Sequence, residues 1–263
     1  MPYIEVEGAR FNYRFDGPDN TPVLVFSHSL GANLSMWDPQ LPELTQKFRV
    51  LRYDSRGHGL TDVTPGPYTI ERLARDLVVL LDALKIERAH FCGLSMGGMV
   101  GQWLGVNAAN RFGSITLCNT AAKIGTVESW NTRIQTIKDG GMAAVALAVI
   151  PRWFTEDFIK RAPAEVDNIR KILIHTSPDG YAASCAALRD ADLRELIARV
   201  TVPTLMISGT HDAVSPPAEG KFIVKQIHGS QYAELNASHL SNIEASKKFT
   251  EALTKFLVRQ ETT

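Results

Sequence analysis

The sequence predicts an α/β fold: a mostly parallel central sheet with helices on both faces and an inserted helical cap. Three observations lead to this prediction. Short apolar, β-rich runs alternate with segments of helical periodicity. One such run passes into a helical pattern through a Gly-x-Ser-x-Gly turn at residues 93–97. Between residues 123 and 190 the alternation stops, and helical periodicity alone remains.

The start of the chain predicts a hairpin and then buried strands. Residues 3–6 and 10–15 flank a Glu7-Gly8 turn, which is typical of a hairpin. Residues 23–27 and 50–53 are apolar and β-rich, as expected of parallel strands that are covered on both faces.

From residue 68 onward, helices and strands alternate. Residues 68–84 predict a helix because leucines recur on one face, at Leu73, Leu77, Leu80, Leu81 and Leu84. The later predicted elements are strands at 89–92, 114–118, 204–208 and 232–235 and helices at 96–107 and 244–259.

We therefore divide the chain into an α/β core, residues 1–122 and 191–263, and a helical cap, residues 123–190. The cap contains helix breakers at Gly140-Gly141, Pro151, Pro163 and Pro178 and no convincing strand. A segment of this length is too long for a loop in a compact domain, so we expect helices that cover the sheet edge.

Charge and composition exclude several classes of function. Lys plus Arg number 28 and Asp plus Glu number 28, and no basic stripe is visible. Neither nucleic acid nor a membrane surface is therefore expected as a partner. No secretory signal and no apolar run of membrane-spanning length is apparent, which predicts a cytoplasmic protein. The sequence leaves the oligomeric state open.

Cysteine and histidine spacing gives no indication of a cofactor. Cys92 and Cys118 lie in apolar, strand-like runs, and with Cys185 they make an odd count, so we expect buried free thiols. Neither a His-Glu-x-x-His pattern nor paired cysteines occur. No metal and no other cofactor is therefore expected.

The turn Gly93-Leu94-Ser95-Met96-Gly97 is the most informative stretch of the chain. A serine between a strand and a helix in this pattern adopts a strained backbone, which lifts its Oγ clear of the sheet. The flanking glycines are needed because the helix and the neighbouring strand pass too close for a Cβ. Ser95 is therefore the predicted nucleophile.

Asp212 and His239 each follow a predicted strand, as Ser95 does. The carboxyl ends of parallel strands meet at one edge of a sheet, so these three side chains can converge on one crevice. Asp190 and Asp192 precede the strand that Asp212 follows, which places them at the wrong edge. Ser95, Asp212 and His239 thus form a candidate catalytic triad in the chain order nucleophile, acid, histidine.

These residue types suit nucleophilic catalysis. A serine hydroxyl must lose its proton as it attacks, and a histidine can accept that proton and pass it to the leaving group. A carboxylate fixes the imidazole tautomer and stabilises the imidazolium. Two backbone N–H groups should bind the developing oxyanion, that of Met96 and that of Leu30, with Ser29 as the alternative to Leu30.

The other histidines have simpler interpretations. His28 is expected to brace the oxyanion loop, His58 to belong to a structural turn and His90 to begin a strand. His175 lies in the cap, and the simplest interpretation of His211 and His228 is that they face solvent.

With these features in place, the chain resembles the α/β-hydrolase superfamily over nearly its whole length, including the turn at residues 53–59. It resembles more closely the bacterial 3-oxoadipate enol-lactonases of the β-ketoadipate pathway of aromatic degradation. Residues 27–33, Met36-Trp37 and residues 92–98 carry this resemblance in the core, and residues 128–134 and 151–155 carry it in the cap. The cap stretches matter most, because the core motifs recur in many esterases.

The resemblance implies the opening of an anionic enol-lactone by water without a cofactor. The free carboxylate of such a substrate requires a cation in an otherwise apolar pocket. We expect Arg133 to supply it, with Trp130 beside it as an apolar wall, and we take Arg152 and Trp153 as the second choice.

The triad does not separate this activity from others on the same fold. The chain could be a carboxylesterase, a carbon–carbon bond hydrolase or a cofactor-free perhydrolase, which a substrate panel would distinguish. A non-catalytic ligand receptor would instead show slow single-turnover hydrolysis and tight retention of product.

Overall fold

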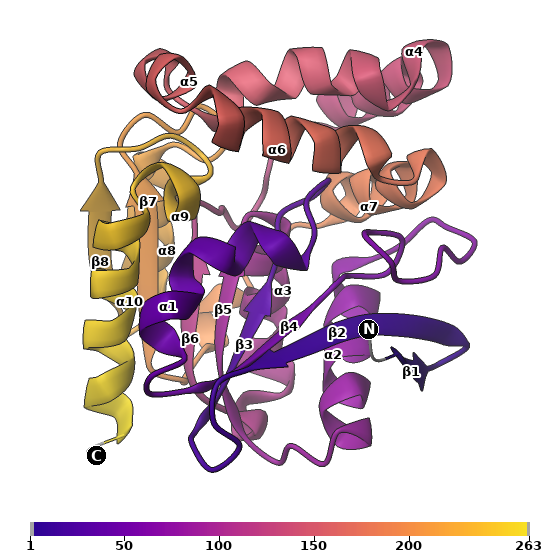
Figure 1. Ribbon diagram of the computed structural model, residues 1–263. Coiled ribbons are helices and arrows are strands. Elements are labelled where there is room, and N and C mark those ends of the chain that lie inside the picture. The colour runs from indigo at the N-terminus through magenta and orange to yellow at the C-terminus, as the bar shows by residue number, and fades with distance from the viewer. Residues whose placement is uncertain (1–2, 262–263) are drawn as a thin grey trace.

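A computed structural model describes residues 3–261 of the chain, and its centre is a sheet of eight strands (Figure 1). The strand order is β1-β2-β4-β3-β5-β6-β7-β8. The pairs β1–β2 and β2–β4 are antiparallel, and all other neighbouring pairs are parallel. The strands are β1 (Tyr3–Val6), β2 (Ala9–Asp16), β3 (Val23–Ser27), β4 (Arg49–Tyr53), β5 (Ala89–Leu94), β6 (Phe112–Cys118), β7 (Thr204–Gly209) and β8 (Gln231–Leu235).

Helices cover both faces of this sheet. On one face pack α2 (Ile70–Ala83), α3 (Met96–Asn107) and α8 (Pro217–Gln226); on the other pack α1 (Leu41–Leu44), α10 (Ser246–Glu261) and the 3₁₀ helix η1 (Leu34–Gln40). Short connections contain α9 (Ser241–Glu244), η2 (Ala109–Arg111) and η3 (Ile197–Arg199). The central strands β5 and β7 are buried along their whole length, which explains their mainly apolar sequences. The predicted α/β class is confirmed.

Four further helices form a layer above the carboxyl ends of the parallel strands (Figure 1). They are α4 (Val127–Trp153), α5 (Glu156–Arg161), α6 (Pro163–His175) and α7 (Pro178–Asp190). Side-chain caps begin three of them: Thr126 accepts from the Ser129 N–H, Thr155 from the Phe158 N–H and Ser177 from the Gly180 N–H. A non-helical residue, Gly141, interrupts α4.

The structure corrects the ends of several predicted elements. The helix expected at 68–84 begins at Ile70, because Thr69 has an extended backbone and caps the Arg72 N–H. The helix expected at 244–259 is two helices, α9 and α10, which the non-helical residue Ala245 separates. Leucine periodicity marks the buried face of a helix, but the cap residue decides where the helix starts.

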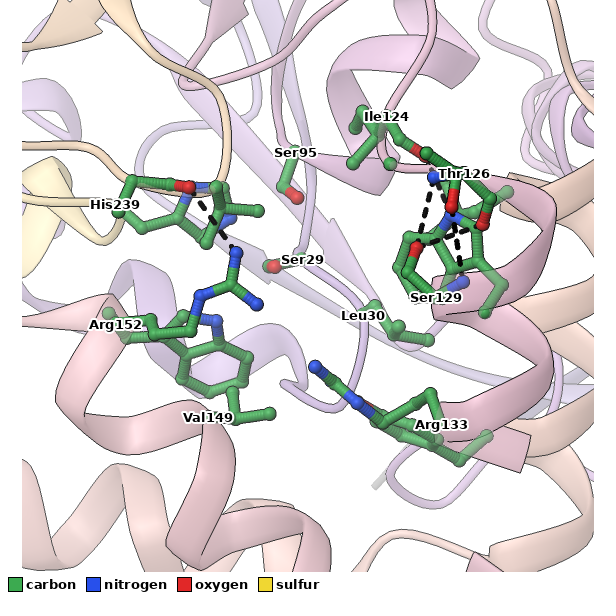
Figure 2. Close-up of a pocket in the computed structure, with 17 residues that line it drawn as sticks. Ser29, Leu30, Ser95, Ile124, Thr126, Ser129, Arg133, Val149, Arg152 and His239 are labelled. Atoms are coloured by element: carbon green, nitrogen blue, oxygen red, sulfur yellow. Dashed lines mark hydrogen bonds between the residues drawn. The ribbon is translucent and has the colours of Figure 1, made fainter. Parts of the chain in front are cut away.

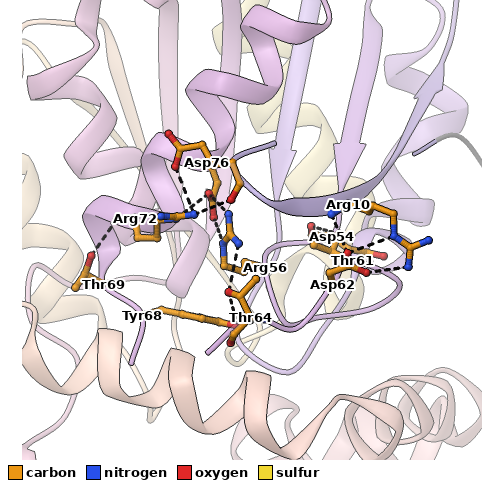
Figure 3. Close-up of polar contacts among 11 residues, drawn as sticks. Arg10, Asp54, Arg56, Thr61, Asp62, Thr64, Tyr68, Thr69, Arg72 and Asp76 are labelled. Carbon is orange, nitrogen blue, oxygen red and sulfur yellow. Dashed lines mark hydrogen bonds and ion pairs between the residues drawn. The ribbon is translucent and has the colours of Figure 1, made fainter. Parts of the chain in front are cut away.

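A buried ion pair fixes the turn after β4 to helix α2 (Figure 3). Arg56 donates from Nε to Asp76 Oδ2 at 2.8 Å and from Nη2 to Asp76 Oδ1 at 2.6 Å. Both side chains are only 1% exposed. Arg72 adds a 3.2 Å contact to the same carboxylate from the next turn of α2. The same turn contacts helix α7, since a Cβ on Gly57 would lie 2.7 Å from the Cα of Gly180. The ion pair therefore supports a turn that lies against the α4–α7 layer.

The three cysteines are buried and free, as expected. Cys92 and Cys118 lie on neighbouring strands with their sulfur atoms 3.7 Å apart. Burial raises the pKa of the Cys92 thiol, which keeps it protonated. Within residues 3–261, no helix is long and apolar enough to cross a membrane.

Candidate active site

Ser95 lies on a strained turn between β5 and α3. Its backbone has φ 57° and ψ −111°, which few residues other than glycine adopt. A Cβ on Gly93 would lie 2.2 Å from the Gly97 carbonyl oxygen, and one on Gly97 would lie 2.3 Å from the Ser27 carbonyl oxygen. Both glycines are therefore required by close backbone approach. The turn holds the Ser95 hydroxyl at the wall of a pocket (Figure 2).

His239 and Asp212 form the second part of the site. Nδ1 of His239 lies 2.8 Å from Oδ2 of Asp212, and both side chains are buried. Since a carboxylate can only accept here, Nδ1 carries the proton and Nε2 is left as the basic nitrogen. His239 lines the same pocket as Ser95, and Figure 2 shows the two side chains as neighbours. The structure thus brings together the three residues of the predicted triad.

Four hydrogen bonds hold the Asp212 carboxylate. Oδ1 accepts from the backbone N–H groups of Val214 at 2.7 Å and Ser215 at 3.0 Å. Oδ2 accepts from His239 and from the side-chain amide of Asn119 at 3.0 Å. Burial alone would raise the pKa of Asp212, but the His239 imidazole and these donors hold it below its ordinary value. The carboxylate is therefore ionised when it orients His239.

Asn119 was missed by the sequence analysis. It follows β6 directly, at the same sheet edge as Ser95, and has a left-handed backbone with φ 44°. Its Nδ2 donates to Asp212 and also to the Ser238 carbonyl oxygen at 3.2 Å, while its Oδ1 accepts from the Ser241 hydroxyl at 2.5 Å. A polar residue directly after a buried strand was the available signal, but an amide has no reactivity that would single it out.

The backbone N–H groups of Met96 and Leu30 have no acceptor in the described part of the chain. The Ser29 N–H, in contrast, donates to the sulfur of Met36 at 3.4 Å. Leu30 lines the same pocket as Ser95 (Figure 2). Of the two predicted alternatives, Leu30 is therefore the one whose N–H is free to bind an oxyanion.

Two buried histidines hold the loop that carries Leu30. His28 Nε2 accepts from the Ser55 N–H at 2.8 Å, so its Nδ1 donates to the Ser29 carbonyl oxygen at 2.7 Å. His58 Nε2 accepts from the Gly31 N–H at 3.0 Å. Burial lowers the pKa of His28 to about 4 and that of His58 to about 3, so both rings are neutral at pH 7. His28 braces the loop, as expected, and the turn that carries His58 does the same.

The other four histidines lie outside the pocket. His90 is buried and contacts Ser114 Oγ at 2.8 Å and Glu261 at 2.5 Å. His175, His211 and His228 are exposed. Among residues 3–261, no three His, Cys, Asp or Glu side chains are grouped as a metal site would require.

The pocket lies between the strand ends and the α4–α7 layer and has a volume of about 350 Å³. Its wall is mainly apolar, and Trp130 and Trp153 both contribute to it. Arg133 and Arg152 also line it, whereas no Asp or Glu does. The full lining is Ser29, Leu30, Ser95, Ile124, Gly125, Thr126, Ser129, Trp130, Arg133, Val149, Arg152, Trp153, Tyr181, Leu188, Ala213, Val214 and His239.

The two pocket arginines are held by neutral groups. Arg133 donates to the Tyr181 hydroxyl at 3.1 Å, and Arg152 donates to the Ala213 carbonyl oxygen at 3.3 Å. Neither forms an ion pair within residues 3–261. Burial raises the pKa of Tyr181, which therefore stays neutral beside Arg133. Two uncompensated positive charges thus face a pocket that also holds Ser95 and His239.

The end of α4 is fastened to the loop that carries His239. The Leu240 N–H donates to the Trp153 carbonyl oxygen at 3.0 Å, and the Ser238 hydroxyl donates to the Arg152 carbonyl oxygen at 3.1 Å. Glu244 accepts from the Ser238 N–H at 2.9 Å and also from the Thr155 hydroxyl. Glu244 was also missed, because its role depends on a contact between distant parts of the chain.

A serine on a glycine-flanked turn, at the carboxyl edge of a mostly parallel sheet, defines this protein's class as an α/β hydrolase. The family model described as alpha/beta hydrolase fold matches residues 22–140. The chain is 40% identical to 3-oxoadipate enol-lactonase 2 of Acinetobacter baylyi over 97% of this chain and 96% of that protein. It is 41% identical to 3-oxoadipate enol-lactonase 1 of the same organism over 95% and 94%.

A solved structure gives the same result. The crystal structure of the enol-lactonase from Burkholderia xenovorans LB400 superposes with a TM-score of 0.97 at 49% identity, covering 98% of this chain and 100% of that chain. The chain therefore belongs to the 3-oxoadipate enol-lactonase family of α/β hydrolases.

Proposed function

We propose that this protein is a hydrolase that opens 3-oxoadipate enol-lactone with water to give 3-oxoadipate, a step of the β-ketoadipate pathway of aromatic degradation. One observation carries the proposal beyond family membership. The pocket that holds Ser95 and His239 also holds two guanidinium groups and no carboxylate, which suits a small anionic ester. No cofactor enters this proposal.

In the first half of the reaction, Ser95 Oγ attacks the lactone carbonyl carbon while His239 Nε2 takes the hydroxyl proton. The N–H groups of Met96 and Leu30 stabilise the oxyanion of the tetrahedral intermediate. Collapse of this intermediate breaks the ring C–O bond, and the electron pair leaves with the enol oxygen. His239 returns its proton either to the enolate carbon, which gives the ketone directly, or to the enol oxygen, which gives an enol that tautomerises to the ketone.

In the second half, water hydrolyses the ester bond between the substrate and Ser95. The ring-opened chain stays attached to Ser95 as an ester, so it cannot leave before hydrolysis. His239 takes a proton from water, the hydroxide adds to the acyl carbon, and the bond to Ser95 Oγ breaks as His239 returns the proton to it. The product is a dicarboxylate. Asp212 stays ionised throughout and stabilises the imidazolium in both halves.

The arginines provide the reason for specificity. Arg133 would bind the free carboxylate of the lactone, with Trp130 as the adjoining apolar wall. Arg152 lies on the His239 side of the pocket in Figure 2, next to Trp153, where the leaving oxygen and the newly formed carboxylate would need a cation. Neither arginine would have to break an ion pair to bind the substrate.

The test is turnover of 3-oxoadipate enol-lactone by the purified protein beside Ser95→Ala and beside p-nitrophenyl acetate. We expect rapid lactone opening that depends on Ser95 and weak hydrolysis of the neutral ester. Ester hydrolysis without lactone opening would indicate a carboxylesterase instead. Absence of turnover with both substrates, together with tight binding of the lactone, would indicate a ligand receptor.

A further inference from the structure

Helix α4 is broken at Gly141, in a backbone conformation that residues with a side chain rarely adopt. Gly141 has φ 66° and ψ −169°, a backbone conformation that is essentially confined to glycine. A Cβ at this position would meet nothing within 4 Å. The glycine is therefore needed for its backbone conformation rather than for space. It divides α4 into a segment that carries Arg133 and a segment that carries Arg152.

An unbroken helix could not place both arginines in the pocket. The two residues are 19 positions apart, which corresponds to about 28 Å along a straight helix, and their side chains would point about 100° apart. The actual pocket has a volume of only about 350 Å³, yet both arginines line it. Figure 2 shows them entering it from separate helical segments.

The buried residues of α4 also favour a break in this helix. Ile137 is buried on the first segment, and Val149 is buried on the second. On an unbroken helix these side chains would point about 120° apart, at opposite edges of one apolar stripe. The break at Gly141 lets both segments turn their apolar faces toward the rest of the molecule.

We propose that Gly141 is a specificity-determining residue, because its break in α4 pairs Arg133 with Arg152 in a binding site for ligands with two carboxylates. The inference rests on the proposed function in one respect, that Ser95 and His239 act on the ligand of this pocket. It adds that the pocket prefers a dicarboxylate, such as the product of ring opening, over a monocarboxylate of equal length.

Hydrogen bonds hold the end of the second segment. Its end is fastened to the His239 loop through the carbonyl groups of Arg152 and Trp153, which accept from Ser238 and Leu240. Arg152 is thereby held at one position relative to His239. The break at Gly141 lets the first segment run in its own direction along α7, where Arg133 donates to the Tyr181 hydroxyl. The two segments together thus set the distance between the two charges that a ligand must match.

The experiment measures binding of adipate and of hexanoate by calorimetry, which requires no turnover. We expect the wild-type protein to prefer adipate. In Gly141→Ala, adipate binding should weaken about 10- to 100-fold, as when a hydrogen bond to a charged group is lost, while hexanoate binding changes less. The matched control is Gly229→Ala: Gly229 has a similar φ of 73° and open space around it, but lies in a turn far along the chain. It should leave both affinities unchanged.

A second pair of variants does not depend on the folding of Gly141→Ala. Arg133→Gln and Arg152→Gln should each remove the preference for adipate over hexanoate. A folded Gly141→Ala protein with wild-type adipate affinity would overturn the inference, as would an arginine substitution that leaves the preference intact. A wild-type protein that binds adipate selectively but does not open the lactone would refute the proposed function while supporting this inference.

Discussion

Asn119 donates to the same Asp212 oxygen that accepts the His239 Nδ1 proton, at 3.0 Å and 2.8 Å respectively. The carboxylate that orients the histidine is therefore itself oriented by a residue from a third strand end. Asn119 is in turn held by the Ser241 hydroxyl, so a chain of hydrogen bonds links α9 to His239.

Replacing Asn119 should weaken catalysis through Asp212. In Asn119→Leu the carboxylate loses one donor, so the pKa of Asp212 should rise and the imidazolium should be less stable. We expect kcat/KM for the lactone to fall about 10- to 100-fold, mainly through kcat. The acid limb of the kcat/KM profile should move to higher pH. Asn107→Ala, which removes an exposed asparagine from α3, is the control. An unchanged pH profile would contradict this role.

Asp212→Asn should be more damaging, because an amide can stabilise the wrong imidazole tautomer. We expect kcat to fall by about 10⁴-fold with a small change in KM. Asp192→Asn is the matched control, since Asp192 precedes β7 and pairs with Lys123 and Arg194 at the surface. Equal loss in the two variants, measured with the lactone as substrate, would rule out the assignment of Asp212.

The two neutral histidines that hold the loop of Leu30, His28 and His58, predict a pH dependence of stability. In the unfolded chain they titrate near pH 6.5, and in the folded protein burial lowers the pKa of His28 to about 4 and of His58 to about 3. Between pH 6.5 and these lower pKa values, the unfolded state binds more protons than the folded state. The contribution to stability is therefore complete above pH 6.5 and is lost as the pH falls below it, by about 1.4 kcal/mol per pH unit for each histidine.

Urea unfolding at several pH values between 4.5 and 7.5 measures this slope. His28→Gln and His58→Gln should each flatten the dependence of the unfolding free energy on pH, although both should lower stability at pH 7. His228→Gln, at an exposed position, should leave the slope as it is. A wild-type slope in both buried-site variants would mean that other groups cause the acid sensitivity.

The buried pair of Arg56 and Asp76 predicts a large single-site effect. Asp76→Ala leaves a guanidinium buried without its partner and should cost about 3–5 kcal/mol in the free energy of unfolding. Glu71→Ala, which removes an exposed ion pair with Arg75 on the same helix, should cost less than about 1 kcal/mol. Urea titration of both variants tests the difference, and similar values would show that burial of the pair contributes nothing.

The sequence analysis succeeded where local pattern determines structure. Ser95 could be placed from a five-residue turn, and Asp212 and His239 from the ends of apolar strands, because parallel strands deliver their carboxyl ends to one edge. The fold class followed from the same alternation. Arg133 and Arg152 were selected as cations in the cap stretches, and the structure shows why both reach one pocket.

Other features depend on contacts between distant segments. The sequence showed that Gly141 could break a helix. It did not show that this break redirects a helix between two arginines. Asn119 contacts Asp212 and Glu244 contacts Thr155, partners that lie 93 and 89 residues away in the chain. Such partners have no periodicity, so composition and spacing could not identify them.

The fastening of α4 to the His239 loop has a consequence for how this enzyme could acquire a new substrate. Residues on both sides of His239, the proposed general base, bind the backbone at the end of α4, so the helical layer and His239 are held together. A chimaera that exchanges the whole layer for that of another hydrolase would also replace the support of its own base. New specificity is therefore more accessible through side-chain changes on the first segment of α4, which leave that support in place.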